Sequence, residues 1–379
     1  MDEATSPVAA RRLRLELVRS RMRELQVDAL LLSHGADLPW LTGYRAMPLE
    51  RLTLLVLPVD DEPVLVVPAL EAPRVPDPGC AFRLRPWLDT EDPLDMAEEL
   101  LRHVRRGRLG ISDRAWATTV LGLQERLPEA AFVTASTVTS PLRAVKDAHE
   151  IRALRAAAQA ADRVAAALQA GAIELVGRTE KAVSDEIAER LVAEGHHKVN
   201  FAIVGSGPNG ASPHHDAGDR VIGAGDLVVC DFGGELVLPG DDSGYCSDIT
   251  RTVATGPLSG EAADAYAVLA AAQQAGVAAA RVGVAAEDVD RAARKVIEDA
   301  GLGERFIHRT GHGIGLEEHE DPYLVAGNTE PLVVGHAFSV EPGIYFPGRY
   351  GMRLEDIVVV GPDGPEPLNT VDHQLVVLG

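Results

Sequence analysis

Three histidines and three glycines gather in one short stretch of the chain, His308-Arg-Thr-Gly-His-Gly-Ile-Gly-Leu-Glu-Glu-His319. Gly311, Gly313 and Gly315 leave His312 with little steric cover, so its imidazole can approach another group closely. Taken alone, the stretch is as consistent with a turn-rich surface loop as with a functional site. Its meaning therefore depends on which other side chains could meet these histidines.

Four acidic residues lie inside otherwise apolar, strand-like runs: Asp231, Asp248, Glu341 and Glu355. An unpaired carboxylate is costly to bury, so four of them in one region need a common compensation. Two divalent cations provide it, because two Asp, two Glu and a neutral His sum to −4 against +4. Carboxylate and imidazole ligands without thiolates favour Mn²⁺, Co²⁺, Fe²⁺ or Zn²⁺. Two such ions can share a water molecule and lower its pKa, which would give a hydroxide poised to attack a carbonyl.

Strand periodicity predicts which of these side chains share a face. Alternation places Asp231 beside Gly233, Asp248 beside Thr250, and Glu355 beside residue 353, an arginine. The glycine turn at 205–210 lacks the Gly-Lys-Ser/Thr ending of a phosphate loop. We interpret it as a turn that positions the histidines that follow it.

The remaining patterns predict the elements that hold these residues. Residues 1–140 alternate strands and helices, which is typical of an α/β domain with a mixed or mostly parallel sheet. They carry no convergent polar cluster, so we assign this domain to positioning rather than chemistry. Residues 141–379 form the second predicted domain, with helices expected at 147–171, 180–194, 259–281 and 285–300 and strands carrying the four acids.

Composition limits the classes of function. The chain has 379 residues, with 36 Lys and Arg against 57 Asp and Glu, a formal charge of −21. Such a charge argues against nucleic acid or an anionic membrane as a partner. No apolar run approaches the roughly 18 residues of a spanning helix, and the N-terminus has no signal-peptide pattern. Three cysteines, Cys80, Cys230 and Cys246, make no disulfide framework, so we expect a soluble protein in the reducing cytoplasm.

Several motifs together resemble the pita-bread metallopeptidase family, which includes methionine aminopeptidases, Xaa-Pro aminopeptidases, prolidases and the metal-free relative creatinase. These motifs are Gly-His-Gly-Ile-Gly, Ser-Asp-Ile-Thr-Arg-Thr, Glu-Pro-Gly-Ile-Tyr and Arg-Leu-Glu-Asp. The catalytic resemblance covers about residues 145–379 and is strongest to bacterial Xaa-Pro dipeptidases. The N-terminal part is similar to the creatinase/prolidase N-terminal domain through weaker features, such as Leu41-Thr-Gly-Tyr44.

The resemblance implies a role for each candidate residue. The ligands of the two metals would be Asp231, Asp248, His312, Glu341 and Glu355. Glu341 would also move a proton from the attacking water to the leaving nitrogen. The remaining site residues would be His214, His319, Arg353 and Tyr345.

These other residues would act on the substrate. His214 and His319 would take part in catalysis and bind the substrate and its developing oxyanion. Arg353 would orient Glu355 or bind a substrate carboxylate, and Tyr345 would lie near the substrate or be a core aromatic. His215 and His308 are expected to have supporting roles.

The implied function is cleavage of Xaa-Pro dipeptides by a hydroxide that bridges two metal ions, with Mn²⁺ the expected metal. Alternatives are an Xaa-Pro aminopeptidase acting on longer peptides, or a non-catalytic binding module of the same fold. The resemblance also implies a homodimer. One departure concerns Asp231 and Asp248, which are 17 residues apart (248 − 231). We expect the additional residues, 235–243, to extend a hairpin turn without displacing either acid.

Overall fold

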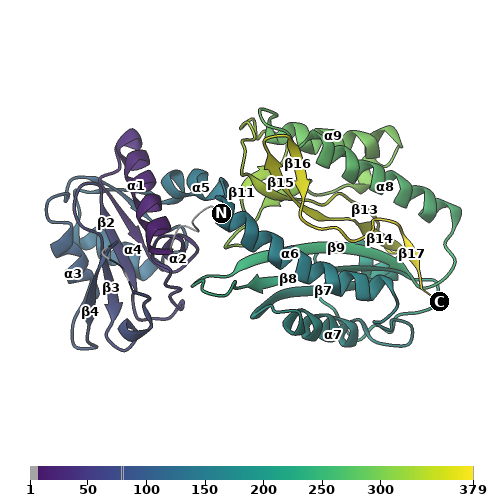
Figure 1. Cartoon of the computed structure of the whole chain (residues 1–379), viewed down its shortest axis with the longest axis horizontal. Coiled ribbons are helices and arrows are strands. Elements are labelled where there is room, and N and C mark those ends of the chain that lie inside the picture. The colour runs from purple at the N-terminus through teal and green to yellow at the C-terminus, as the bar shows by residue number, and fades with distance from the viewer. Residues whose placement is uncertain (1–6, 78, 80, 379) are drawn as a thin grey trace. The chain divides into compact units, whose positions relative to one another are not determined.

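Figure 1 presents the computed structural model of the chain, which describes residues 7–77, 79 and 81–378. The chain divides into two compact units, one of residues 1–143 with 239–243, the other of residues 144–238 with 244–379. The division falls three residues (143 − 140) after the boundary expected from the sequence. Residues 239–243, which the sequence analysis placed in the second domain, group with the first. Cys230 and Cys246 are buried and form no disulfide, whereas Cys80 and the N-terminal residues 1–6 lie outside the described residues.

The first unit contains a six-stranded mixed sheet in the order β4-β3-β2-β1-β5-β6. Its strands are β1 (Ala29–Leu32), β2 (Leu54–Pro58), β3 (Val64–Pro68), β4 (Arg83–Trp87), β5 (Arg108–Ile111) and β6 (Ala131–Thr134). Its helices are α1 (Pro7–Leu25), α2 (Asp37–Thr42), η1 (Ala72–Arg74), α3 (Pro93–Leu100), α4 (Ala117–Arg126) and α5 (Ser136–Ala144). Apolar side chains of α3 and α4 pack against one face of this sheet. The α/β alternation predicted from the sequence is confirmed.

The second unit combines paired helices with smaller sheets. Its helices are α6 (Ala148–Gln169), α7 (Glu180–Ala193), η2 (Gly207–Ala211), α8 (Gly260–Ala279), α9 (Ala286–Asp299) and η3 (Gly303–Arg305). One sheet has the order β17-β9-β8-β7 and another the order β11-β10-β12-β15-β16, and β13 pairs with β14. The strands are β7 (Lys198–Ser206), β8 (Leu227–Leu236), β9 (Tyr245–Ala254), β10 (Gly311–Gly313), β11 (Glu320–Leu324), β12 (Ala337–Val340), β13 (Gly343–Phe346), β14 (Tyr350–Arg353), β15 (Asp356–Gly361), β16 (Gly364–Pro367) and β17 (Val376–Val377).

Alternation along β8 and β9 separates an apolar face from a functional face. Cys230, Phe232 and Ile249 belong to a core shared with α6 and α7, and Figure 1 shows α7 beside β7, the strand next to β8. Asp231 and Asp248 have the opposite parity, so they point away from those helices. The same rule applies to the other sheet, whose β12 and β15 pack Phe338, Val340, Val358 and Val360 together with residues of α8 and α9. The odd-numbered positions of these strands therefore face away from α8 and α9.

Local signals explain where the long helices begin. Asp147 caps α6, and its side chain accepts hydrogen bonds from the backbone N–H groups of His149 and Glu150. The side chain of Glu150 accepts a hydrogen bond from the backbone N–H of Asp147, which completes a capping box. Thr179 and Ser259 cap α7 and α8 in the same way, each with its side chain. Among the described residues, no helix combines the length and the apolarity needed to cross a bilayer.

Candidate active site

The hairpin of β8 and β9 places two predicted ligands on one face. Asp231 pairs with Thr250 and Gly233 pairs with Asp248, so the two acids are diagonal neighbours across the ladder. The strands continue from Leu236 on β8 to Tyr245 on β9, and the extra residues form the turn between them. A longer turn therefore leaves the register intact, as the sequence analysis expected.

Glycines on both sides of His312 allow neighbouring backbones to come close. A Cβ atom at Gly311 would lie 1.8 Å from the carbonyl oxygen of Ser339, and one at Gly313 would lie 2.2 Å from that of Asp321. The two glycines therefore allow β10 to pack closely between β11 and β12, in addition to adding no side chain beside the imidazole of His312. The hydroxyl of Ser339 also accepts a bond of 3.1 Å from the backbone N–H of His312.

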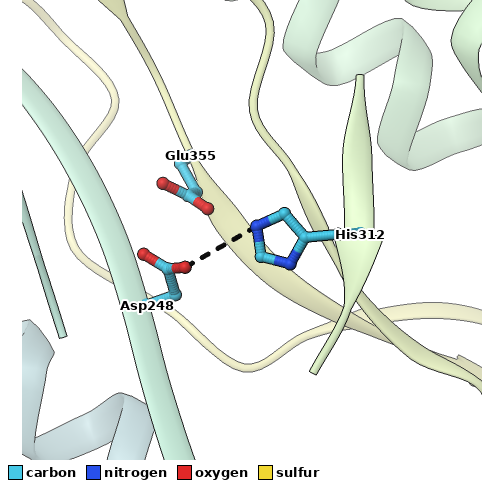
Figure 2. Close-up of side chains that lie close together, drawn as sticks. All are labelled: Asp248, His312 and Glu355. Atoms are coloured by element: carbon cyan, nitrogen blue, oxygen red, sulfur yellow. Dashed lines mark ion pairs between the residues drawn. The ribbon is translucent and has the colours of Figure 1, made fainter. Parts of the chain in front are cut away.

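Figure 2 shows that Asp248, His312 and Glu355 converge although they come from separate strands and connections. One ligand atom from each of the three lies within 4.8 Å of the others, and all three residues are buried. His312 Nε2 lies 3.8 Å from Asp248 Oδ2 and 3.2 Å from Glu341 Oε1. Glu341 therefore belongs to the same cluster, at the end of β12.

These residues fit a divalent cation. Buried oxygens Oδ1 of Asp231, Oδ1 of Asp248 and Oε1 of Glu355 have no hydrogen-bond partner within the described part of the chain. His312 Nδ1 lies 3.2 Å from the carbonyl of Gly313, so this nitrogen carries a proton and donates it. Nε2 then faces the carboxylates and is the nitrogen that would bind a cation, after giving up the proton that it shares with Glu341 in the metal-free protein.

The electrostatics of the cluster indicate mutual repulsion among its carboxylates. Burial and the charges of Glu355 and Asp231 raise the pKa of Asp248 well above its usual value. Burial and the charges of Glu341 and Asp231 likewise raise the pKa of Glu355. Burial alone would also raise the pKa of Glu341, but the hydrogen bond and charge of His312 outweigh it and lower that pKa. Two carboxyls thus resist ionisation while the third stays ionised.

Arg353 and Tyr345 are buried beside the cluster. The guanidinium of Arg353 donates from Nε to Thr250 Oγ1 (3.1 Å), from Nη1 to the Tyr345 hydroxyl (2.9 Å) and from Nη2 to Asp231 Oδ2 (2.6 Å). His308 Nδ1 lies 2.7 Å from a backbone carbonyl, so its Nε2 accepts the proton of the Tyr345 hydroxyl at 2.9 Å. Arg353 thus holds Asp231 in position, and Tyr345 does the same for His308. Burial raises the pKa of Tyr345 to about 12.

The two remaining predicted residues lie at the accessible side of the site. The ring of His319 stacks on that of His312 with centroids 3.8 Å apart. Burial, followed by the nearby His312 and Arg309, lowers the pKa of His319 to about 4. His214 is exposed, and within the described residues no hydrogen bond or ion pair joins it to the cluster. His214 makes a further, smaller contribution to the lowered pKa of His319.

A buried carboxylate that the sequence analysis missed holds the segment before His214. Glu180, at the start of α7, accepts bonds from the backbone and hydroxyl of Ser206, from Asn209 and from Nε2 of His215. Burial alone would raise the pKa of Glu180, but these hydrogen bonds outweigh it and lower the pKa. An acid in the first turn of a helix is ordinarily interpreted as a dipole partner, so the sequence offered no signal for this role.

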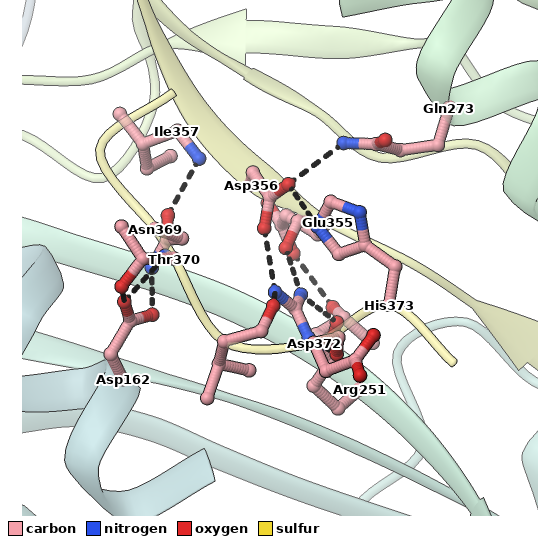
Figure 3. Close-up of polar contacts among 12 residues, drawn as sticks. Asp162, Arg251, Gln273, Glu355, Asp356, Ile357, Asn369, Thr370, Asp372 and His373 are labelled. Atoms are coloured by element: carbon pink, nitrogen blue, oxygen red, sulfur yellow. Dashed lines mark hydrogen bonds and ion pairs between the residues drawn. The ribbon is translucent and has the colours of Figure 1, made fainter. Parts of the chain in front are cut away.

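A second missed network lies behind Glu355, as Figure 3 shows. The fully buried Arg251 donates to the backbone oxygen of Glu355 and forms an ion pair of 2.8 Å with the fully buried Asp356. Asp356 also accepts from Gln273 of α8 and contacts His373. The sequence did contain a signal for this network: Arg251 lies inside the β-branched run of β9, and an arginine buried there needs an acidic partner.

Residues 152–362 match the model of metallopeptidase family M24, and residues 14–145 match the creatinase/prolidase N-terminal domain. The chain therefore belongs to metallopeptidase family M24 and is a peptidase. The family and fold predicted from the sequence are confirmed, with a creatinase/prolidase-like domain followed by a pita-bread domain. Membership also implies a divalent metal.

Relatives resemble the chain over nearly its full length. A probable dipeptidase PepE of Mycobacterium bovis is 45% identical over 368 residues, covering 96% of this chain and 96% of that protein. An Xaa-Pro dipeptidase of Lactobacillus delbrueckii subsp. lactis is 34% identical over 371 residues, covering 96% and 98%. The solved structure of dipeptidase PepE from Mycobacterium ulcerans has a TM-score of 0.91 at 44% identity and covers 98% of this chain and 99% of that one.

Proposed function

We propose that this peptidase hydrolyses Xaa-Pro dipeptides with two divalent cations, Mn²⁺ the expected metal. The ligands would be Asp231, Asp248, His312, Glu341 and Glu355. The observation that carries the proposal is the buried cluster whose carboxylate oxygens lack partners among the described residues. When bound, the ions would polarise the scissile carbonyl and lower the pKa of water. The names of the dipeptidase relatives support a dipeptide substrate.

The chain's own side chains supply the remaining chemistry. Glu341 accepts a proton from the attacking water and donates it to the proline nitrogen, which must be protonated because the bond is a tertiary amide. His214 and His319 donate hydrogen bonds to the substrate and to the developing oxyanion. Arg353 and Tyr345 hold Asp231 and His308 in place.

The direct test is the release of free proline by purified protein reconstituted with Mn²⁺. We expect turnover of Ala-Pro and much slower turnover of Ala-Pro-Ala, and no turnover of either after chelation. Efficient cleavage of the tripeptide would instead identify an Xaa-Pro aminopeptidase. A folded, metal-loaded protein that cleaves neither would disprove the proposal. We also propose that the protein is a homodimer, as the family resemblance implies, and that it is located in the cytoplasm, as its composition suggests.

Removal of metal should destabilise the protein more at neutral than at mildly acidic pH. In the metal-free protein the pKa of Asp248 and of Glu355 is raised. Between the unfolded value and the raised folded value, the folded state binds more protons than the unfolded state, so stability falls as pH rises through that window. Bound cations compensate the repulsion. The measurement is the drop in melting temperature on adding EDTA at both pH values, and equal drops would contradict the convergence of charges.

A further inference from the structure

Arg353 is buried and donates to protein oxygens from all three of its guanidinium nitrogens, so it is poorly placed to receive a substrate carboxylate. These oxygens belong to Thr250, Tyr345 and Asp231. Its side chain is 3% exposed. The family resemblance allows this arginine either to orient Glu355 or to bind a substrate carboxylate, and these contacts favour an orienting role. A dipeptide would therefore need another cation for its C-terminal carboxylate.

Arg309 is a cation on the accessible side of the same site. Its guanidinium carbon lies 4.4 Å from the ring centroid of Tyr323, a cation–π contact that fixes its plane. Its Nη2 lies 3.4 Å from Nδ1 of His319. Arginine can only donate, so Nδ1 of His319 accepts and the ring proton is on Nε2. Arg309 and His319 thus present hydrogen-bond donors side by side.

Arg309 has no acidic partner within the structurally described part of the chain. Other arginines of the second unit that lie near acids are paired with them, as Arg251 is with Asp356. Glu320, which directly follows His319, forms a buried ion pair with Lys146. Arg309 and Tyr323 are both partly exposed, and His319 is exposed. A partly exposed guanidinium held by an aromatic ring and lacking a counter-ion is suited to an anionic ligand.

We propose that Arg309 and His319 bind the C-terminal carboxylate of the substrate, and that Arg309 thereby selects dipeptides over longer peptides. This inference rests on the proposed function, and it identifies the C-terminal carboxylate as the part of the substrate that the same site recognises. In a dipeptide only three bonds, of about 1.33, 1.46 and 1.52 Å, separate the scissile carbonyl carbon from the carboxylate carbon. The carboxylate must therefore lie close to the reacting carbonyl. The ring centroids of His319 and His312 lie 3.8 Å apart, and Nη2 of Arg309 lies 3.4 Å from His319, so His319 adjoins the cluster and Arg309 adjoins His319.

The charge of the substrate explains the selectivity. In a longer peptide a neutral amide occupies the position of the carboxylate, and it cannot form the charge-assisted pair with Arg309. A hydrogen bond to a charged group contributes about 1.5–3 kcal/mol, which corresponds to a factor of about 10 to 150. The C-terminal amide of the dipeptide, Ala-prolinamide, removes the charge without adding a residue. It therefore isolates recognition of charge from recognition of length.

The experiment compares Ala-Pro with Ala-prolinamide in Mn²⁺-loaded full-length protein. Wild-type protein should prefer the free acid by about 10-fold or more in kcat/KM. Arg309→Met should lose most of that preference by losing activity toward Ala-Pro, while its activity toward the amide changes little. Arg309→Lys, which keeps the charge but not the planar fork, should fall between them. Arg305→Met, an exposed arginine four residues earlier, is the matched control and should behave as wild type.

A second readout does not depend on turnover. Free proline should raise the melting temperature of the wild-type protein more than prolinamide does, and Arg309→Met should abolish the difference. If Arg309 only positioned His319, both substrates would lose activity by the same factor, and the assignment would be wrong. Equal turnover of acid and amide by wild-type protein would also overturn it. A wild-type protein that releases no proline at all would refute the proposed function itself, and this inference with it.

Discussion

Replacing Glu341 with glutamine should lower proline release by about 10² to 10⁴-fold while the protein remains folded, because the variant loses the proposed carrier of the proton. Glutamine keeps the shape of the side chain but can neither accept a proton nor return it. The carboxylate lies 3.2 Å from His312 Nε2, inside the cluster where the attacking water would be bound. Steady-state kinetics on Ala-Pro at saturating Mn²⁺ give the measurement.

Metal content distinguishes the two roles proposed for Glu341. If the residue acts in proton transfer, Glu341→Gln should retain much of its bound Mn²⁺ by elemental analysis while kcat falls. Loss of metal and activity together would indicate that it serves mainly as a ligand. Glu330→Gln, at an exposed position, is the control and should retain full activity. A Glu341→Gln variant with more than a tenth of wild-type kcat would contradict the assignment.

Replacing Arg251 with methionine should destabilise the second unit by about 3–5 kcal/mol, the cost of leaving one partner of a buried ion pair uncompensated. Arg251 and Asp356 are both fully buried. Arg251 also donates to backbone oxygens of Thr250, Glu355, Val371 and Asp372. Its removal would therefore leave several carbonyls without a donor, in addition to the unpaired carboxylate.

The chain offers an internal control for this measurement. Its three tryptophans, Trp40, Trp87 and Trp116, all belong to the first unit. Urea unfolding followed by far-UV circular dichroism reports both units, whereas tryptophan fluorescence reports the first. The dichroism transition of Arg251→Met should move to lower urea, and that of Arg291→Met, whose side chain is 66% exposed, should not. An unchanged transition in Arg251→Met would show that the network contributes little to stability.

Local sequence patterns were sufficient to predict most of the helices and strands. Helical periodicity predicted the long helices of the second unit, such as α6, which lies within the expected range 147–171. These signals depend on residues close in the chain, so they can be interpreted without the fold. The two-residue strand period also assigned the faces of Asp231 and Asp248, which the ladder of β8 and β9 confirms.

The candidate site was only partly accessible from sequence. The residue types identified the acids and His312 as a group, because four carboxylates in apolar runs require a shared compensation. The partners of Arg353 were not predictable, since its contacts reach 122 residues back to Asp231 and 103 residues back to Thr250. The role of Glu180 was also hidden, because the groups that it binds follow it by 26 to 35 residues.

The sequence by itself therefore determined the family and most of the helices and strands, and it supplied the set of side chains that we propose as metal ligands. Only the tertiary structure decided which donors are already occupied and which remain available. It buried Arg353 against Thr250, Tyr345 and Asp231, and left Arg309 beside His319 without a counter-ion among the described residues. The physical reason is that hydrogen bonds and ion pairs saturate: whether a charged group can bind a substrate depends on which partners the folded chain has already brought to it.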